Sequence, residues 1–383
     1  MRLFLRKWKL FFQCYYLSFR NKLKRKLGKI TRSKLSNLDS YDLSPSKSYL
    51  YYAKLIENGR NLTNEEYHSV VSQSEQRHRL KDLIKCRRLS SPVSSIESLQ
   101  AWGDFNRIRT LLSFDSEQSC PIEIVTHSTQ DIDGDLPLMI CMQGYNSGAH
   151  LSLGEIRQPY DVYKVDAGSA IALQAAELGF RVISYERPCF GERKEKRIKK
   201  PIPNPTVDAV FSWLMMGRTL IGETVSELVS VIDWAQSKFR NADKRIFLSG
   251  YSAAGTTAIF TSALDERVSG IAVGGCVGML KDTVMQRGTG GYVAIPDLLL
   301  HFEFDSILSL IAPRICVVVS GTNDHIYPYY GAETCISSAR KHFKKINASD
   351  ALVHKEVVGG HTYYPDVLWP SLVETMRCRG ISF

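Results

Sequence analysis

Residues 244–260 place a serine where its hydroxyl could act as a nucleophile. An apolar strand pattern runs into Gly250-Tyr-Ser252 and continues as a helix pattern. Small residues stand around the serine at 250, 254 and 255, as a cramped strand-turn-helix elbow requires. Such a turn lifts the hydroxyl clear of the sheet and directs main-chain N–H groups toward an oxyanion. A serine at an ordinary helix N-cap has the same local pattern, so other residues must decide.

Two further residues could activate this serine. A serine hydroxyl is a poor nucleophile at neutral pH, so acyl transfer needs a histidine base and a carboxylate that orients it. With a nucleophile on this kind of elbow, the chain order is serine, acid, histidine, each at a strand end. Asp324 follows the apolar run 315–320, and His361 follows a Val-Val-Gly-Gly run. Their order and positions predict a catalytic triad of Ser252, Asp324 and His361.

Each partner has an alternative explanation when it is taken alone. Asp324 could cap a turn, and His325 and His354 lie close to the same strand ends as His361. The triad assignment rests on the joint placement of three separate loops in the required order.

An oxyanion hole would need two main-chain donors near the serine. We expect one from the N–H of Ala253, directly after the nucleophile, and one from Tyr145 in the loop after the third predicted strand. Gly144 would allow that loop to turn closely, although a plain glycine-rich connection is the alternative. Gln143, Gly144 and Tyr251 are the residues that we expect to contact the substrate.

The elements that would position these residues begin near residue 106. Short β-rich runs alternate there with longer helical patterns, which indicates a largely parallel sheet with helices on both faces. Strands are predicted at 108–114, 122–127, 136–142, 181–185, 245–248, 270–273, 314–320 and 351–358. Helices are predicted at 166–178, 211–239, 252–264, 330–343 and 365–376. This is the order of an α/β-hydrolase fold, an eight-stranded mostly parallel sheet, with an insertion at 277–304 that we expect to shape the substrate pocket.

Composition restricts the class of protein. The 383 residues are 44% hydrophobic and 23% charged, which is typical of a soluble globular chain. The nine cysteines form no CxxC pair and have no ligand-like spacing to histidine. We therefore expect a reduced compartment, no disulfide framework, no metal and no cofactor.

The net charge of +10 is concentrated at the N-terminus. Residues 1–34 contain twelve Lys or Arg and no acidic residue, so the remainder is close to neutral. A helical stripe there combines aromatic and aliphatic residues opposite basic ones, but its longest apolar run is too short to span a bilayer. No signal-peptide cleavage site follows it.

Such an amphipathic arm suits the surface of an anionic membrane. A helix that packs on the rest of the protein is the alternative, and nucleic-acid binding is not expected because nothing in the body resembles a nucleic-acid module. The expected location is the cytoplasm, with peripheral attachment to the inner membrane face as an option.

Three regions follow from these patterns. Residues 1–34 form the basic arm, 35–105 a helical accessory segment with helices near 48–57 and 64–86, and 106–383 the α/β-hydrolase domain.

Several ordered blocks resemble one branch of the α/β-hydrolases. They are residues 190–193, 217–222, 250–255, 265–268, 292–296, 310–314, 321–328 and 359–361. From about residue 106 to its C-terminus the chain resembles acetyl xylan esterases and dienelactone-hydrolase-like proteins. The resemblance implies a metal-free serine esterase that removes small acyl groups, often acetyl, from substrates such as carbohydrates through an acyl-enzyme.

The sequence departs from this family in two places. Gln143-Gly144 stands where the family usually has His-Gly, which alters the rim of the pocket, and the first 105 residues have no counterpart. Alternatives with the same triad are a thioesterase or lipid acyl hydrolase at a membrane surface, and an oligopeptidase-type peptidase, which would need a propeller domain. An inactive hydrolase-like scaffold held at membranes by the arm is the alternative from another class.

Overall fold

The computed structural model describes residues 44–59, 71–96, 99–115, 118–198, 203–239, 245–287 and 291–381. The predicted basic arm at 1–34 lies outside these ranges, and its contact with a membrane stays a prediction. Residues from Tyr52 onward form one compact unit, which contains all of the site described below.

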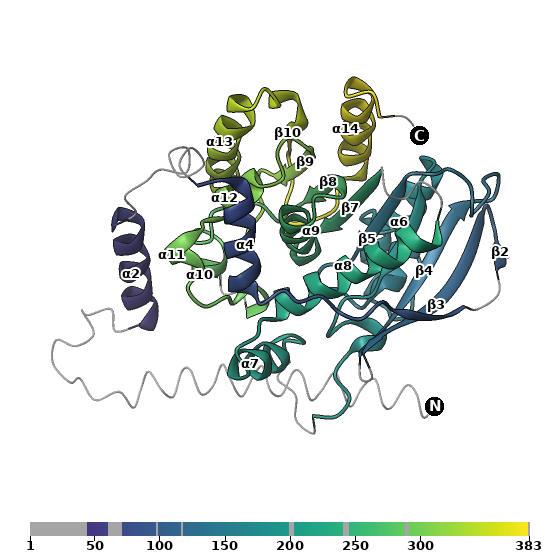
Figure 1. Cartoon of the computed structure of the whole chain (residues 1–383), viewed down its shortest axis with the longest axis horizontal. Helices are drawn as coiled ribbons and strands as arrows, with labels where there is room; N and C mark the ends of the chain where they lie inside the picture. Colours follow the sequence, from purple (N-terminus) through teal and green to yellow (C-terminus); the bar gives the residue numbers. More distant parts are fainter. Residues whose placement is uncertain are drawn as a thin grey trace. The chain divides into compact units, whose positions relative to one another are not determined.

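The described strands form one mostly parallel sheet of ten (Figure 1). Their order is β1-β3-β4-β6-β5-β7-β8-β9-β10, and β2 pairs with β3. The strands are β1 (Val93–Ile96), β2 (Gln100–Trp102), β3 (Phe105–Asp115), β4 (Gln118–His127), β5 (Leu138–Met142), β6 (Arg181–Tyr185), β7 (Ile246–Tyr251), β8 (Val268–Gly274), β9 (Ile315–Gly321) and β10 (Leu352–Val357). All eight predicted strands are present as β3 to β10, with β3 and β4 antiparallel to their neighbours.

The central strands are apolar on both sides because helices cover both faces of the sheet. All seven residues of β9 are buried, a near-continuous apolar run that is typical of parallel sheets. Successive residues of β7 belong to different hydrophobic clusters: Phe247 lies in the cluster that includes residues of α6 and α14, and Leu248 in the one that includes residues of α8, α9, α12 and α13.

The helices follow the predicted pattern with two exceptions: residues 167–170 are not helical within the predicted helix 166–178, and the predicted helix 211–239 is divided. They are α2 (Pro45–Gly59), α4 (Gln73–Ile84), α5 (Asp161–Asp166), α6 (Ile171–Glu177), α7 (Val207–Met215), α8 (Leu220–Lys238), α9 (Ala253–Leu264), α10 (Val284–Arg287), α11 (Leu298–His301), α12 (Phe304–Ser309), α13 (Tyr329–Lys345) and α14 (Pro365–Cys378). The prediction of one helix over 211–239 is wrong, since α7 and α8 are separate. Gly217 has φ +69° between them, and the Thr219 side chain caps α8 by accepting from the Gly222 N–H at 3.0 Å. None of the helices in the described ranges is long and apolar enough to cross a bilayer.

The segment 35–105 differs from the helical expectation. Its described part contains α2 and α4, but also the short strands β1 and β2, which pair with β3 at the sheet edge. Strands of four and three residues carry too few side chains to show an alternating pattern, so no strand signal is visible for them in the sequence. Residues 60–70, which include the start of the predicted helix 64–86, lie outside the described ranges.

Candidate active site

Ser252 lies on a strained turn between strand β7 and helix α9. Its φ of 57° and ψ of −131° are unusual for a residue with a side chain. The glycines around it leave no room for substitution: a Cβ on Gly250 would lie 2.7 Å from the Ala254 carbonyl carbon, and one on Gly255 would lie 2.5 Å from Cys276 Sγ. The small residues therefore allow the chain to reverse within one turn and expose the serine.

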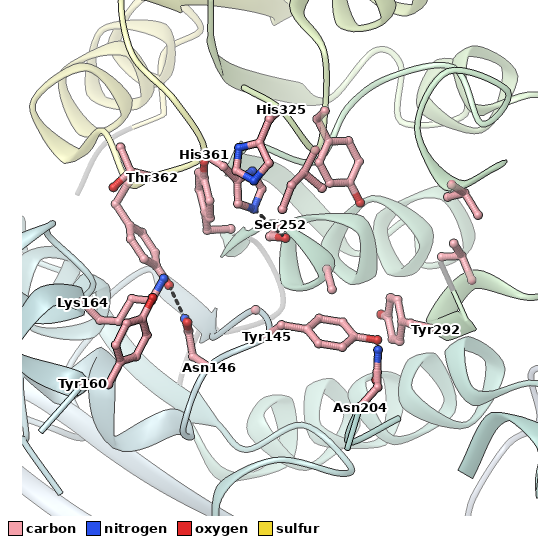
Figure 2. Close-up of a pocket in the computed structure, with 18 residues that line it drawn as sticks. Tyr145, Asn146, Tyr160, Lys164, Asn204, Ser252, Tyr292, His325, His361 and Thr362 are labelled. Carbon is pink, nitrogen blue, oxygen red and sulfur yellow. Dashed lines mark hydrogen bonds between the residues drawn. The ribbon is translucent and has the colours of Figure 1, made fainter. Parts of the chain in front are cut away.

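His361 and Asp324 meet Ser252 in a continuous chain of hydrogen bonds, of which Figure 2 shows the link between His361 and Ser252. His361 Nε2 lies 3.1 Å from Ser252 Oγ, and His361 Nδ1 lies 2.8 Å from Asp324 Oδ2. A carboxylate can only accept, so Nδ1 carries the proton and Nε2 is free to accept from the serine hydroxyl. The structure thus brings together all three residues of the predicted triad.

Asp324 is held in place by its own turn. Its Oδ1 accepts from the N–H groups of Ile326 at 2.8 Å and Tyr327 at 2.9 Å, and its side chain is 1% exposed. This is the turn-capping role that the sequence left open, and it coexists with the bond to His361. A carboxylate fixed on one oxygen presents the other in a single direction.

The two other histidines near these strand ends lie differently. His354 is on β10, where its Nε2 pairs with Ser320 Oγ at 3.0 Å, and burial lowers its pKa to about 4. His325 borders the same cavity as His361, with 6.2 Å between the two ring centroids.

The loop after β5 packs closely against the elbow at Gly144. A Cβ on Gly144 would stand 2.7 Å from the Tyr251 carbonyl oxygen and 3.2 Å from Ser252 Cβ. The main-chain N–H groups of Tyr145 and Ala253 donate to no acceptor within the ranges that the structure describes. Both N–H groups are therefore unpaired in this part of the described structure.

The fit of Gly144 leads to a prediction. Gly144→Ala should lower kcat about 10- to 100-fold, because the added methyl group would push the loop away from the elbow and displace Tyr145, whose N–H is the predicted donor to an oxyanion. The control is Gly291→Ala, since a Cβ at Gly291 meets nothing within 4 Å. Ester hydrolysis by the two variants, with circular dichroism to verify folding, tests this. Equal kcat values for both variants would contradict it.

Gln143 does not border the cavity, unlike the expectation that it contacts substrate. Its amide nitrogen donates to Ser152 Oγ at 2.8 Å and to the Ser169 carbonyl at 2.9 Å. Its oxygen accepts from Asn146 Nδ2 at 3.0 Å and from the Tyr363 hydroxyl. Both ends of the amide are engaged in hydrogen bonds and Gln143 is buried, so the side chain ties the loop to the segment that follows His361 and forms no part of the cavity wall.

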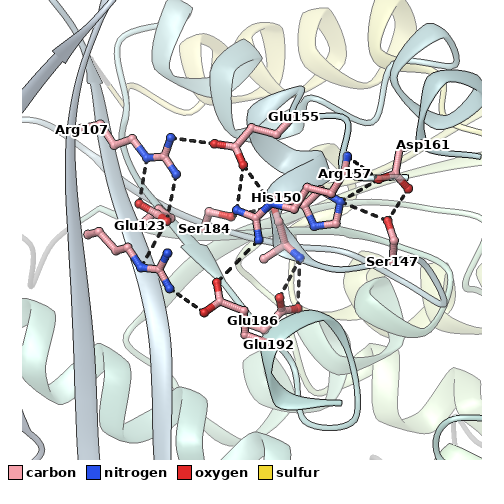
Figure 3. A network of polar contacts seen from close by, with 12 residues as sticks. Arg107, Glu123, Ser147, His150, Glu155, Arg157, Asp161, Ser184, Glu186 and Glu192 are labelled. Atoms are coloured by element: carbon pink, nitrogen blue, oxygen red, sulfur yellow. Dashed lines mark hydrogen bonds and ion pairs between the residues drawn. The ribbon is translucent and has the colours of Figure 1, made fainter. Parts of the chain in front are cut away.

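A buried polar network holds the far end of the same loop (Figure 3). Ser147 Oγ donates to Asp161 Oδ1 at 2.5 Å, and His150 Nε2 lies 2.9 Å from Asp161 Oδ2. Both Glu186 carboxylate oxygens lie near the Ala149 N–H, at 3.0 and 3.1 Å. Serine, histidine and aspartate meet here, but His150 contacts both Ser147 Oγ and Asp161 Oδ2 through the same nitrogen, Nε2. It therefore cannot relay a proton from the serine to the aspartate.

Glu186 makes this network sensitive to pH. Burial raises the pKa of its carboxyl to about 7, against the opposing effect of the main-chain N–H groups of Ala149 and Glu192. The folded state then binds a proton more tightly than the unfolded chain, so this contribution to stability is present at low pH and is lost as the pH rises to about 7.

We expect Glu186→Gln to remove this dependence. The free energy of unfolding of the wild type should fall relative to the variant by about 3 kcal/mol between pH 4 and pH 8. Urea denaturation at several pH values measures the difference. Parallel pH profiles for the two proteins would show that Glu186 does not titrate in this range.

A cavity of about 460 Å³ opens at the serine. Gly144 and Tyr251 border it as predicted, and Val284, Tyr292 and Val293 show that the 277–304 insertion forms part of its wall. The lining residues are Gly144, Tyr145, Asn146, Tyr160, Lys164, Asn204, Tyr251, Ser252, Ala253, Val284, Tyr292, Val293, His325, Ile326, Tyr327, His361, Thr362 and Tyr363. Tyrosines dominate this set, which contains no carboxylate. Such a wall offers ring faces and hydroxyls to a polar, uncharged or anionic ligand.

Comparisons with known proteins agree with this fold. No protein-family model matches the chain. "Putative hydrolase YtaP" of Bacillus subtilis (strain 168) is 25% identical over 261 residues, which are 66% of this chain and 81% of that protein. A structure described as a "putative acetyl xylan esterase" from Bacteroides fragilis NCTC 9343 has a TM-score of 0.69 at 16% identity, covering 88% of this chain and 96% of the other. A glucuronoyl esterase from Solibacter usitatus has a TM-score of 0.61 at 12% identity, covering 82% of this chain and 93% of the other.

These neighbours confirm the α/β-hydrolase fold that the strand order predicts, and one of them is described as an acetyl xylan esterase, the family that the sequence blocks resemble.

Proposed function

We propose that this chain is a serine carboxylester hydrolase that acts through an acyl-enzyme. The observation that carries the proposal is the hydrogen-bonded series Ser252, His361 and Asp324 on a strained elbow that opens into a cavity. This geometry suits acyl transfer because nucleophile, base and orienting carboxylate are already in contact.

The proposed reaction proceeds in two halves. Ser252 Oγ attacks the acyl carbonyl while His361 Nε2 takes the hydroxyl proton, and the resulting oxyanion accepts from the N–H groups of Ala253 and Tyr145. The protonated histidine then gives its proton to the departing alcohol as the ester C–O bond breaks. Water then attacks the carbonyl of the acyl-enzyme while His361 takes a proton from it. The bond to Ser252 Oγ breaks, His361 returns a proton to that oxygen, and the carboxylic acid leaves. Asp324 stays ionised and holds the imidazole throughout.

For the substrate we propose a small acyl ester of a carbohydrate, with acetyl as the first candidate. Two observations support it. The cavity combines tyrosine rings with the amides of Asn146 and Asn204, groups that suit sugar faces and hydroxyls. The solved structures with the same fold include proteins described as acetyl xylan and glucuronoyl esterases.

A panel of esters tests the proposal. We expect nitrophenyl acetate and acetylated xylo-oligosaccharides to be hydrolysed, and kcat/KM to fall as the acyl chain lengthens from acetate to octanoate. A maximum at octanoate would favour a lipid acyl hydrolase, and cleavage of a glucuronate methyl ester above the acetates would favour a glucuronoyl esterase. Failure to cleave any ester would contradict the proposed function.

A further inference from the structure

Arg187 is a buried cation with no carboxylate partner among the described residues. It lies two residues after β6, and its side chain is 2% exposed. No aspartate or glutamate in the described ranges lies within 4.0 Å of its guanidinium, and its Nε has no hydrogen-bond acceptor. Its Nη1 donates a hydrogen bond to the Gln143 carbonyl oxygen at 3.1 Å.

Other buried arginines show how the same fold usually accommodates such a charge. Arg193 forms an ion pair with Glu227 through two hydrogen bonds of 2.7 Å. Arg181, at the start of β6 and thus at the other end of that strand from Arg187, donates to the carbonyls of Ile132 at 2.7 Å and Gly134 at 2.6 Å. Burying a charge without a partner costs free energy, so we expect another interaction to compensate for the burial of Arg187.

The surroundings of Arg187 connect it to the candidate site. Its guanidinium carbon stands 4.6 Å from the ring centroid of Tyr292 and 5.0 Å from that of Phe190. Tyr292 itself borders the cavity, next to Tyr145 (Figure 2). Phe190 packs edge-on against the Tyr145 ring, with 5.1 Å between centroids. The cation therefore stands directly behind the wall that carries the expected oxyanion donor.

We propose that Arg187 is a positioning residue for the oxyanion loop and a fixed source of positive potential behind it. The proposal rests on the proposed function, since it concerns an oxyanion that forms at Ser252. Arg187 does not border the cavity, so it acts through the Gln143 carbonyl and through the two aromatic rings.

The timing of the charge explains the expected effect. The substrate ester is neutral at its carbonyl, whereas the tetrahedral intermediate carries a full negative charge on that oxygen. A buried cation that cannot reorient favours the second state over the first, because little solvent screens it. Removing it should therefore lower kcat and leave KM nearly unchanged.

Three variants and one control test the proposal. Arg187→Met removes charge and hydrogen bond, Arg187→Gln removes the charge but keeps a donor, and Arg187→Lys keeps the charge on a shorter reach. We expect kcat to fall about 30- to 100-fold for the two neutral variants and about 3- to 10-fold for lysine, with KM within about threefold of the wild type. A trifluoromethyl ketone, which binds as an oxyanion adduct, should lose affinity by the same factors. Arg181→Met, which removes an equally buried cation away from the site, should leave kcat unchanged.

Several outcomes would overturn the proposal. They are a kcat for the lysine variant as low as for the neutral variants, a rise in KM equal to the fall in kcat, or an equal loss of kcat in Arg181→Met. If circular dichroism shows that the neutral variants are unfolded, Arg187→Lys alone provides the test. A lysine variant with the kcat and inhibitor affinity of the wild type would contradict the positioning role. Failure of the proposed function is distinguishable, because the wild type would then hydrolyse no ester at all.

Discussion

Ser252→Ala should abolish turnover, with a loss of about 10⁴-fold or more in kcat and little change in KM. The methyl group of alanine fits the elbow, but it leaves His361 without a hydroxyl to deprotonate and no acyl-enzyme can form. The residual rate would come from the oxyanion donors and from binding alone. Steady-state hydrolysis of nitrophenyl acetate, with circular dichroism as the test of folding, measures the effect.

The matched control is Ser249→Ala. Ser249 lies three residues earlier on β7, is buried, and its hydroxyl has no hydrogen-bond partner within the described residues. We expect its kcat to equal that of the wild type. A folded Ser252→Ala protein that keeps more than one-tenth of the activity would exclude Ser252 as the nucleophile.

His361→Gln and Asp324→Asn should produce the next largest losses, about 10³- to 10⁴-fold in kcat. Glutamine cannot serve as a base. In Asp324→Asn, one oxygen can still accept from the Ile326 and Tyr327 N–H groups, so the amide nitrogen faces His361 Nδ1. The imidazole must then accept at Nδ1 and carry its proton on Nε2, which is the wrong tautomer for deprotonating Ser252.

His325→Gln and His354→Gln are the controls for this prediction. His325 borders the cavity, and His354 is engaged with Ser320 on strand β10. Neither approaches Ser252 Oγ within hydrogen-bond distance in the described structure. We expect kcat within about fivefold of the wild type for both. A loss of kcat in His325→Gln as large as that in His361→Gln would contradict the assignment of His361 as the general base.

The triad and the sheet were predictable because their signals are local. The strand runs, the small residues around Ser252, and the positions of Asp324 and His361 directly after strands are all visible within short windows of the sequence. The break between α7 and α8 also had a signal, since Gly217 followed by Thr219 is a helix end followed by a cap.

Gln143 and Arg187 could not be placed correctly from the sequence. The hydrogen bond from the Tyr363 hydroxyl to Gln143 joins residues 220 positions apart, and no local pattern reveals that the amide is engaged inside the protein. The significance of Arg187 lies in the absence of a nearby carboxylate among the described residues, which only the packed structure can show. Strands β1 and β2 were missed because their order comes from backbone pairing with β3.

Covalent labelling with a fluorophosphonate tests the central claim most directly, since this probe reacts with a serine that an adjacent base activates. Wild type and Ser252→Ala would be treated in parallel and analysed by mass spectrometry of the intact chain and of its peptides. The predicted result is one adduct on the peptide that contains Ser252 in the wild type, and no adduct in the variant. An unlabelled wild type, or equal labelling of both proteins, would contradict the mechanism.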